Sequence, residues 1–431
     1  MNPILPPQFY IPDVEARQWE DGIVYLYGSS DKGGGNSYCS HEYHVFGSAD
    51  MKQWTVYPGS FRSGNVHRSQ SRTASLYAPD CEKIGDKYCL FYCQENGEEG
   101  VAYSDTPYGP FQNAHGIDPA DTDGIDPAIL VDDDGSLYYF WGQYHAKGGK
   151  LDLASGKIIP GTVTESILTE EEHGFHEGIS IRKRNGIYYL IYSDISRGRP
   201  TCLGYAVSER PLGPYKKGGI IIDNTGCDPE SWNNHGSIAQ VNGKWYVFYH
   251  RSTHNSRFSR QVCVEPILFN EDGTIDEVEM TTQGIEDPLD CFRPLEAYRG
   301  CRLEGGCYID AHSEGEQYYE YITHFGAGNT VAYKYLIFPE RPARVTLEAS
   351  GCGNNASVKV YLDGREENVL AEIDLADTGG EHDFRRFSGS FMGEVGEGRH
   401  SLHLKLIGNG ETSICLKTIC FEAGDTAESE G

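Results

Sequence analysis

One short pattern recurs five times within the first 250 residues, and it constrains the fold more than any other feature. Each copy is a polar turn with Gly followed by an aromatic-rich run, and the copies recur every 50 to 63 residues. They are DGIVYLYG (21–28), GDKYCLFY (85–92), DGSLYYFWG (134–142), NGIYYLIYS (185–193) and NGKWYVFYH (242–250). Strand units repeating at this period are typical of β-propeller blades. The sequence therefore predicts an all-β fold with a five-bladed propeller.

Two longer segments strengthen this interpretation, because a second strand follows the aromatic run in at least two copies. AYSDTPYGPF (102–111) and YAVSERPLGPY (205–215) share Ser, Pro and a Gly-Pro-aromatic ending at matching places. The alternative is a β-sandwich whose aromatic strands resemble one another by coincidence. A parallel β-helix would need a much shorter repeat.

Composition limits the partners and the compartment. The formal net charge of −28 disfavours nucleic acid and anionic membranes, which would repel the chain, but not a neutral sugar. The 13 cysteines are irregularly spaced without CxxC, so they are interpreted as buried thiols in a reducing compartment. The N-terminal segment lacks a basic and apolar leader. We expect a cytoplasmic protein, or a secreted one if a signal peptide was removed; its oligomeric state stays open.

Five chemically useful side chains stand at nearly equal offsets, 11 or 12 residues before the aligned tyrosine of each copy. They are Asp13, Tyr77, Asp126, Glu177 and His235. In a propeller the first strand of each blade lines the central channel, so these side chains are predicted to converge at one mouth. The offset also separates two copies of GIDPA, since only Asp126 has the right spacing and Asp118 is expected in a loop.

Three carboxylates around one mouth are costly to bury unless they are used. Glycoside hydrolysis needs one protonated and one ionised carboxyl group, to protonate the leaving oxygen and to activate water. Each of these residues taken alone could have a purely structural role, as an Asp that forms a turn before Pro does. Their joint pattern favours a catalytic site over five separate structural roles.

At these residues the sequence resembles glycoside hydrolase family 43 over roughly residues 1–285. The matching motifs are IPDVEAR, Ala78-Pro79, Asp126-Pro127-Ala128, Glu177-Gly178 and His235-Gly236-Ser237. Two departures occur: Val14 follows Asp13 where the family more often has Pro, and Ile179 replaces the usual Pro after Gly178. The resemblance implies a five-bladed propeller with inverting activity, mainly on arabinofuranosides, xylosides or arabinans.

The resemblance also implies roles. Asp13 would be the general base and Glu177 the general acid, while Asp126 would hold the acid and raise its pKa. Arg260 resembles a substrate-contacting arginine, and Tyr77, His176 and His235 are further candidates for substrate binding. Many family members hold a calcium ion through waters near the residue matching His235. No cofactor is expected to be required; the other interpretation of His235 is a channel histidine bonded to water or a carboxylate.

The predicted catalytic domain covers residues 1–285 and is followed by a connector at 286–299. Strand-rich segments at 328–338, 343–351, 357–364 and 400–408, with clear apolar–polar alternation in SVKVYL and HSLHLKL, predict a jelly-roll sandwich over 300–424. The tail 425–431 is predicted to be disordered. The sandwich is similar to carbohydrate-binding module family 6, but it contains no Trp after residue 300. Tyr318 and Tyr333 could stack on a sugar, although core packing is the favoured interpretation.

Three functions are therefore weighed. The first is a glycosidase that removes arabinofuranosyl or xylosyl residues from plant-type oligosaccharides or polysaccharides. The second is an endo-arabinanase or galactofuranosidase of the same fold. The third is a catalytically inactive sugar-binding propeller, which the presence of all three acids disfavours.

Overall fold

A computed structural model describes residues 1–65, 74–118, 124–198, 201–229, 234–315, 317–352, 356–410 and 412–424. The predicted tail, 425–431, lies outside this range. The described fold is all-β, as predicted: its helical elements are α1 (Glu170–His173), η1 (Ser63–Asn65) and η2 (Ala297–Arg299). None of the described helices is long and apolar enough to cross a membrane.

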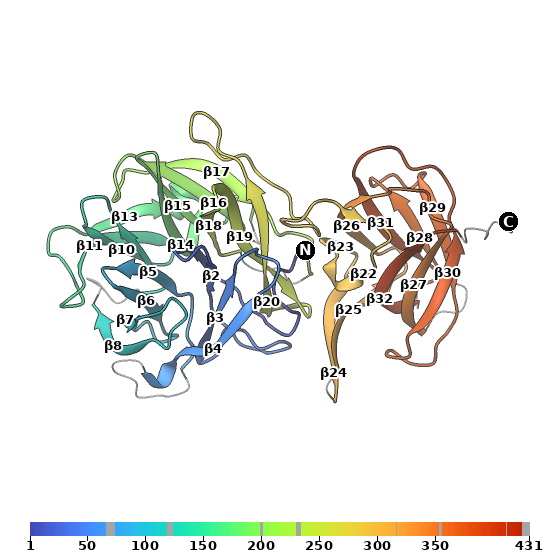
Figure 1. Ribbon diagram of the computed structural model, residues 1–431, viewed down its shortest axis with the longest axis horizontal. Coiled ribbons are helices and arrows are strands. Elements are labelled where there is room, and N and C mark those ends of the chain that lie inside the picture. The colour runs from blue at the N-terminus through green and yellow to red at the C-terminus, as the bar shows by residue number, and fades with distance from the viewer. Residues whose placement is uncertain are drawn as a thin grey trace.

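Residues 1–267 form five antiparallel sheets in chain order (Figure 1). The first sheet contains β1 (Glu15–Gln18), β2 (Val24–Tyr27), β3 (Glu42–Ser48) and β4 (Thr55–Arg62). The second contains β5 (Asp80–Ile84), β6 (Lys87–Cys93), β7 (Glu99–Ser104) and β8 (Gln112–Ile117). The third contains β9 (Ala128–Val131), β10 (Leu137–Trp141), β11 (His145–Asp152), β12 (Lys157–Ile158) and β13 (Thr164–Thr169). The fourth contains β14 (Phe175–Arg184), β15 (Ile187–Asp194), β16 (Cys202–Ser208) and β17 (Lys216–Ile222), and the fifth contains β18 (Ser237–Val241), β19 (Lys244–Thr253) and β20 (Ser256–Ile267).

The five sheets close into a ring. Their first strands contact one another in the order β1, β5, β9, β14, β18 and back to β1. Five separate apolar clusters fill the spaces between consecutive sheets, and one of them joins the fifth sheet to the first. Each sheet is therefore covered on both faces, and the first strands surround a common axis.

The recurring aromatic runs are the second strands of the sheets, which explains why they are apolar without interruption. Successive side chains of a strand point to opposite faces. In β15, Tyr188, Leu190 and Tyr192 pack into the cluster shared with the third sheet, whereas Tyr189 and Ile191 pack into the cluster shared with the fifth. Both sets of side chains are buried, so a strict apolar–polar alternation is absent.

The C-terminal region consists of two six-stranded sheets around one core (Figure 1). One contains β21 (Leu289–Asp290), β23 (Arg302–Glu304), β26 (Thr330–Ile337), β31 (His400–Ile407), β28 (Ala356–Leu362) and β29 (Val369–Leu375). The other contains β22 (Leu295–Glu296), β24 (Tyr308–Glu314), β25 (Gln317–Gly326), β32 (Ser413–Glu422), β27 (Arg344–Cys352) and β30 (Arg385–Ser390). The stretch expected as a connector, 286–299, thus supplies β21 and β22 to these sheets.

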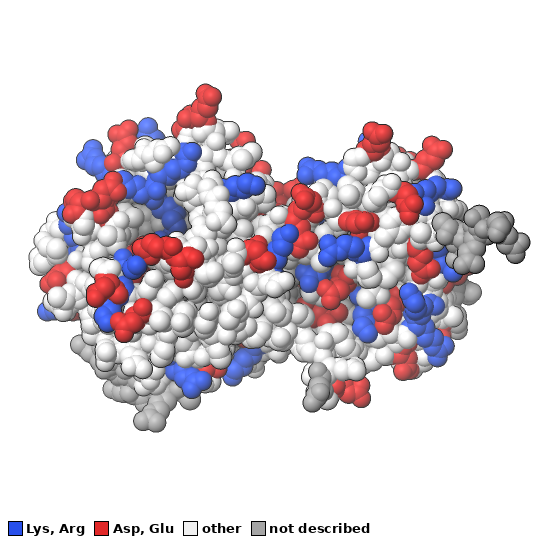
Figure 2. All heavy atoms as spheres, in the orientation of Figure 1, with Lys and Arg blue, Asp and Glu red and all other residues white. Residues whose placement is uncertain are grey.

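Surface charge and cysteines follow the composition. On the face shown in Figure 2, acidic and basic side chains are interspersed over both lobes, so this face has no single-sign stripe. Among the cysteines whose side chains the structure describes, twelve have free thiols, and all of these except the half-buried Cys420 are buried. These thiols are small core residues rather than cross-links.

Candidate active site

The predicted site residues stand where each sheet begins. Asp13 lies two residues before β1, Tyr77 three before β5, Asp126 two before β9 and His235 two before β18, while Glu177 lies near the start of β14. Both aspartates adopt positive φ angles, 57° for Asp13 and 53° for Asp126. A side chain in this left-handed conformation is uncommon outside Asn, Asp and Gly, and it turns the chain as it enters the inner strand.

These side chains line one cavity of about 290 Å³ at the mouth of the ring. Its lining residues are Asp13, Tyr38, Cys39, Tyr77, Ala78, Ile125, Asp126, Gln143, Tyr144, His176, Glu177, His235 and Arg260. All seven residues singled out from the sequence are among them. The near-copy Asp118 is exposed and pairs with Lys157 of β12, away from this lining.

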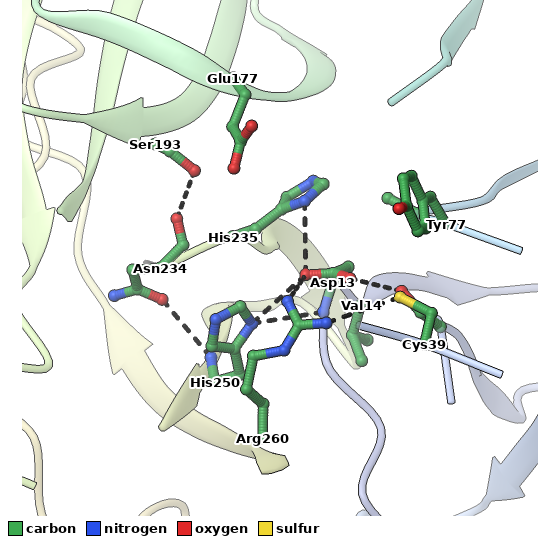
Figure 3. A network of polar contacts seen from close by, with 12 residues as sticks. Asp13, Val14, Cys39, Tyr77, Glu177, Ser193, Asn234, His235, His250 and Arg260 are labelled. Atoms are coloured by element: carbon green, nitrogen blue, oxygen red, sulfur yellow. Dashed lines mark hydrogen bonds and ion pairs between the residues drawn. The ribbon is translucent and has the colours of Figure 1, made fainter. Parts of the chain in front are cut away.

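Asp13 lies in the most heavily bonded part of the cavity (Figure 3). Its Oδ1 accepts a hydrogen bond from Arg260 Nη1 at 2.9 Å, and its Oδ2 accepts one from the Ser29 hydroxyl. The Nδ1 atoms of His235 and His250 both lie 3.6 Å from Oδ1. Asp13 is 6% exposed, so its charge is supported almost entirely by the protein.

These contacts set the protonation state of Asp13. Burial alone would raise the pKa of its carboxyl group, but the Arg260 guanidinium outweighs this with help from His235, His250 and Ser29, so the pKa lies below its usual value. Burial lowers the pKa of His235, which favours its neutral form. Asp13 is therefore an anion at neutral pH.

Arg260 is itself held by a second carboxylate, Asp31. Its Nε and Nη2 donate to the two oxygens of Asp31 at 2.8 and 3.0 Å, and its backbone N–H donates to Oδ2 at 3.1 Å. The planar guanidinium thus bridges two buried acids, Asp13 and Asp31, in a fixed orientation. Arg260 points at Asp13 because Asp31 occupies its other edge.

Asp126 and Glu177 are two further acidic residues that line the cavity. Burial raises the pKa of Asp126 well above its usual value, and the nearby charges of Glu177, Asp13 and Glu99 raise it further. The backbone N–H of Gly178 opposes this by donating to Asp126. Glu177 is half-buried and accepts a hydrogen bond from Gln143 Nε2 at 2.6 Å.

Gly178 is the residue that lets these groups approach. Its φ is +75°, and a Cβ atom there would lie 2.9 Å from the His235 ring. A larger residue would both strain the backbone and displace His235. Figure 3 shows His235 between Glu177 and Asp13, and Tyr77 faces the same space from the other side.

His176 and Tyr77 complete the wall. His176 Nδ1 is 2.8 Å from Glu170 Oε1, and its ring packs edge-on against Tyr144. Tyr77 is half-buried, and burial raises its pKa to about 12, so its hydroxyl stays neutral.

Comparisons with known proteins show the family to which the chain belongs. Residues 1–275 match the family model described as glycosyl hydrolases family 43. A xylosidase/arabinosidase of Thermoclostridium stercorarium is 30% identical, and the alignment covers 98% of this chain and 99% of that protein. The chain belongs to glycoside hydrolase family 43. It is therefore an O-glycoside hydrolase.

Solved structures of the family are similar in fold. A β-xylosidase/α-arabinofuranosidase from a compost metagenome, in complex with xylotriose, is 26% identical with a TM-score of 0.56, covering 65% of this chain and 97% of that one. A Bacillus subtilis arabinoxylan arabinofuranohydrolase of family 43 has a TM-score of 0.55 at 22% identity and covers 98% of this chain and 97% of that one. The second similarity is one of fold, and it extends through the C-terminal sheets.

The surroundings of His235 do not fit a calcium ion bound directly by protein. Calcium takes six to eight oxygen ligands, and imidazole nitrogen is a poor ligand for it. Asp13, the nearest carboxylate, is already bonded to Arg260 and Ser29. Within the described ranges, no group of three or more His, Cys, Asp or Glu side chains could hold a metal ion.

Several residues of this family 43 site were not found from the sequence. Asp31, Tyr38 and Cys39 belong to the long loop after β2, and Gln143 and Tyr144 lie in the short turn between β10 and β11. The first-strand offsets do not apply to them because these loops differ from sheet to sheet. The signal that could have found Gln143 and Tyr144 is their place in a polar loop directly after an aromatic run.

Proposed function

We propose that this enzyme removes arabinofuranosyl or xylosyl residues with inversion of configuration, with Asp13 as general base and Glu177 as general acid. The observation that carries the proposal is the opposite environment of the two groups in one cavity. Asp13 is held ionised by Arg260, whereas Glu177 accepts a hydrogen bond from the Gln143 amide and lies near enough to Asp126 for its charge to raise the pKa of that residue. Inverting hydrolysis requires one ionised carboxyl group as base and one protonated carboxyl group as acid.

The proposed step balances without a covalent intermediate. A water molecule near Asp13 attacks the anomeric carbon and gives its proton to the carboxylate. The bond from the anomeric carbon to the leaving oxygen breaks on the opposite side, and that oxygen takes the proton of Glu177. Gln143 donates to Oε2 of Glu177, which leaves Oε1 as the oxygen that carries the proton.

Asp126 supports the acid. It binds the N–H of Gly178, the residue after Glu177, so it fixes the backbone that carries the acid. Burial and the nearby charge of Glu177 raise the pKa of Asp126 well above its usual value, so two negative charges are unfavourable in this part of the cavity.

The sugar preference is supported by the relatives. The proteins that match across nearly the whole chain are named xylosidase/arabinosidase and arabinoxylan arabinofuranohydrolase. Tyr38, Tyr77 and Tyr144 offer aromatic faces and hydroxyl groups around the cavity. Nitrophenyl glycosides of arabinofuranose, xylose and galactofuranose, with linear arabinan beside them, separate this proposal from a galactofuranosidase or an endo-arabinanase.

We also infer the architecture of the two regions. The five sheets are blades of a five-bladed propeller, supported by the ring of first strands and five inter-sheet clusters. The C-terminal sheets form a jelly-roll related to carbohydrate-binding module family 6. Sugar stacking on Tyr333 is not part of the proposal, because this residue is fully buried, and Tyr318 bonds to Tyr10.

Proton NMR of the first-formed product tests the reaction. Inversion predicts that the anomer opposite to that of the substrate appears first and then equilibrates. A first product with retained configuration would contradict the roles of Asp13 and Glu177. Treatment with a chelator tests for a metal ion. Loss of activity that calcium restores would indicate a water-held ion near His235. Unchanged activity would indicate catalysis without such an ion.

A further inference from the structure

The hairpin formed by β24 and β25 projects from the C-terminal sheets and lies beside β20, the strand that carries Arg260 (Figure 1). One backbone hydrogen bond and one side-chain contact hold the hairpin there. The N–H of His254, in the turn before β20, donates to the carbonyl of Ile309 at 2.6 Å, and His254 Nε2 lies 3.5 Å from Asp310. The C-terminal region therefore packs directly against the wall of the active site.

Glu320 of β25 joins this hairpin to β20 and to Tyr10 by hydrogen bonds. Its Oε1 accepts hydrogen bonds from Gln261 Nε2 and from the Tyr10 hydroxyl, both at 2.8 Å. Gln261 follows Arg260 in β20, and successive side chains of a strand point to opposite faces. Arg260 thus faces the cavity while Gln261 faces the C-terminal sheets, and Glu320 holds this stretch of strand from behind.

Tyr10, the second partner of Glu320, links it to Asp31. The carbonyl of Tyr10 accepts the backbone N–H of Asp31 at 2.9 Å. The Tyr10 ring also fills the space at Gly33, where a Cβ atom would lie 2.5 Å from it. A single carboxylate therefore supports both partners of the Asp31–Arg260 ion pair.

Glu320 is an unusual residue for the C-terminal region because it is a buried acid. Among the described residues from 286 to 424, it is the only buried Asp, Glu, Lys, Arg or His. Its Oε2 has no hydrogen-bond partner in the described part of the chain, and burial raises its pKa to about 7. Burying an incompletely hydrogen-bonded carboxyl group lowers the stability of the fold. The position of Glu320 therefore points to a role other than stabilising the C-terminal region.

We propose that Glu320 is a positioning residue for the reaction, through which the C-terminal region fixes Arg260 and Asp31 and so keeps Asp13 in its working geometry and charge state. The inference rests on the proposed base role of Asp13. It gives the C-terminal region a part in catalysis that does not depend on carbohydrate binding by its own surface. Loss of this support loosens Arg260 and weakens its stabilisation of the Asp13 anion.

The test compares full-length variants by their pH–rate profiles. Glu320→Ala is expected to lower kcat by about tenfold to a hundredfold, the scale of a small misplacement in an active site. It is also expected to move the acidic limb of kcat/KM to higher pH, because that limb reports the base of the free enzyme. Glu320→Gln keeps an acceptor oxygen in place and is expected to stay within about threefold of the parent enzyme.

Glu279→Gln is the matched control. Glu279 also joins the two regions, accepting Lys334 Nζ at 2.6 Å and the Tyr335 hydroxyl, but it does not line the active site. This variant is expected to change stability without moving the acidic limb. If Glu320→Ala does not fold, Tyr10→Phe removes only the hydroxyl contacts, and it is expected to shift the limb in the same direction by a smaller amount.

An unchanged limb and kcat in folded Glu320→Ala or Tyr10→Phe would overturn the inference, as would equal losses in Glu320→Ala and Glu320→Gln. The base role itself is tested separately with Asp13→Asn. Activity retained in Asp13→Asn rejects the proposed base, whereas its loss together with an unaffected Glu320→Ala variant rejects the positioning role alone.

Discussion

The two β regions bury different kinds of side chains. The ring of five sheets has an apolar cluster between each pair of neighbours, and this leaves its axis for polar groups such as Asp13, Asp126, His235 and Arg260. The two stacked C-terminal sheets share one apolar core and have no such axis. The ring therefore separates stability from chemistry: the clusters between sheets stabilise it, and its axis is available for charged groups.

The largest expected effect tests the charged axis. Asp13→Asn should lower the rate by about 10²–10⁴-fold, the usual contribution of a general base. The fold should persist, because Arg260 keeps its ion pair with Asp31. Steady-state kinetics and a thermal melt measure the two effects separately. A variant that loses its fold together with its activity would break the distinction between axis and core.

The converse substitution tests the single core. Leu404 is fully buried among the residues shared by the two C-terminal sheets. Leu404→Ala should lower the free energy of unfolding of this region by about 2–5 kcal/mol, through lost burial and a cavity. Below the melting transition kcat should equal that of the parent enzyme, because Leu404 pairs with Val331 and Val360 in the other C-terminal sheet from Glu320 and does not line the active-site cavity. A reduced kcat in folded protein would show that the core also tunes the site.

Two copies of one motif sharpen the contrast within the ring. Asp126 and Asp118 both stand in GIDPA, but only Asp126 lines the cavity. Asp126→Ala should lower kcat by about tenfold to a hundredfold, because the Gly178 N–H loses its acceptor and the backbone carrying Glu177 loses its anchor. Asp118→Ala, the matched control, should leave kinetics unchanged. Similar losses in both variants would mean that the motif acts through the fold of the third sheet.

Sequence patterns predicted the residues that line the axis of the ring better than those in the loops around the cavity. Equal offsets from Tyr25, Tyr88, Tyr138, Tyr188 and Tyr246 identified lining residues because every sheet enters the ring with the same geometry. Asp31 and Gln143 lie in loops of unequal length, so no repeat indicated them.

The C-terminal region shows a related limit. Strand-rich segments predicted the strands now seen as β26, β27, β28 and β31, with clear alternation in β28 and β31. Their pairing was not predictable, since β27 pairs with β32 and β26 with β31, far along the chain. Glu320 was missed for the same reason: its meaning depends on contacts with Tyr10 and Gln261, which only the folded chain brings close.

The smallest expected effect concerns one hydrogen bond on the axis. The Ser29 hydroxyl donates to Asp13 and so stabilises its anion. Ser29→Ala removes this donor and should raise the pKa of Asp13 from its depressed value. The acidic limb of kcat/KM should then move to higher pH by about one unit, the equivalent of 1.36 kcal/mol. Activity at neutral pH should change little, because Asp13 remains ionised there.

The same shift has a consequence for stability with a definite sign. A carboxyl group with a depressed pKa in the folded state stabilises the fold above its unfolded pKa, and this stabilisation is lost as the pH falls through the folded value. Ser29→Ala should therefore weaken stability mainly at neutral pH and much less in acid. Ser48→Ala is the matched control, because buried Ser48 donates to the exposed Asp50 outside the site. A limb that moves equally in both variants, or toward lower pH in Ser29→Ala, would show that the ring's axis does not hold Asp13 as an anion through this contact.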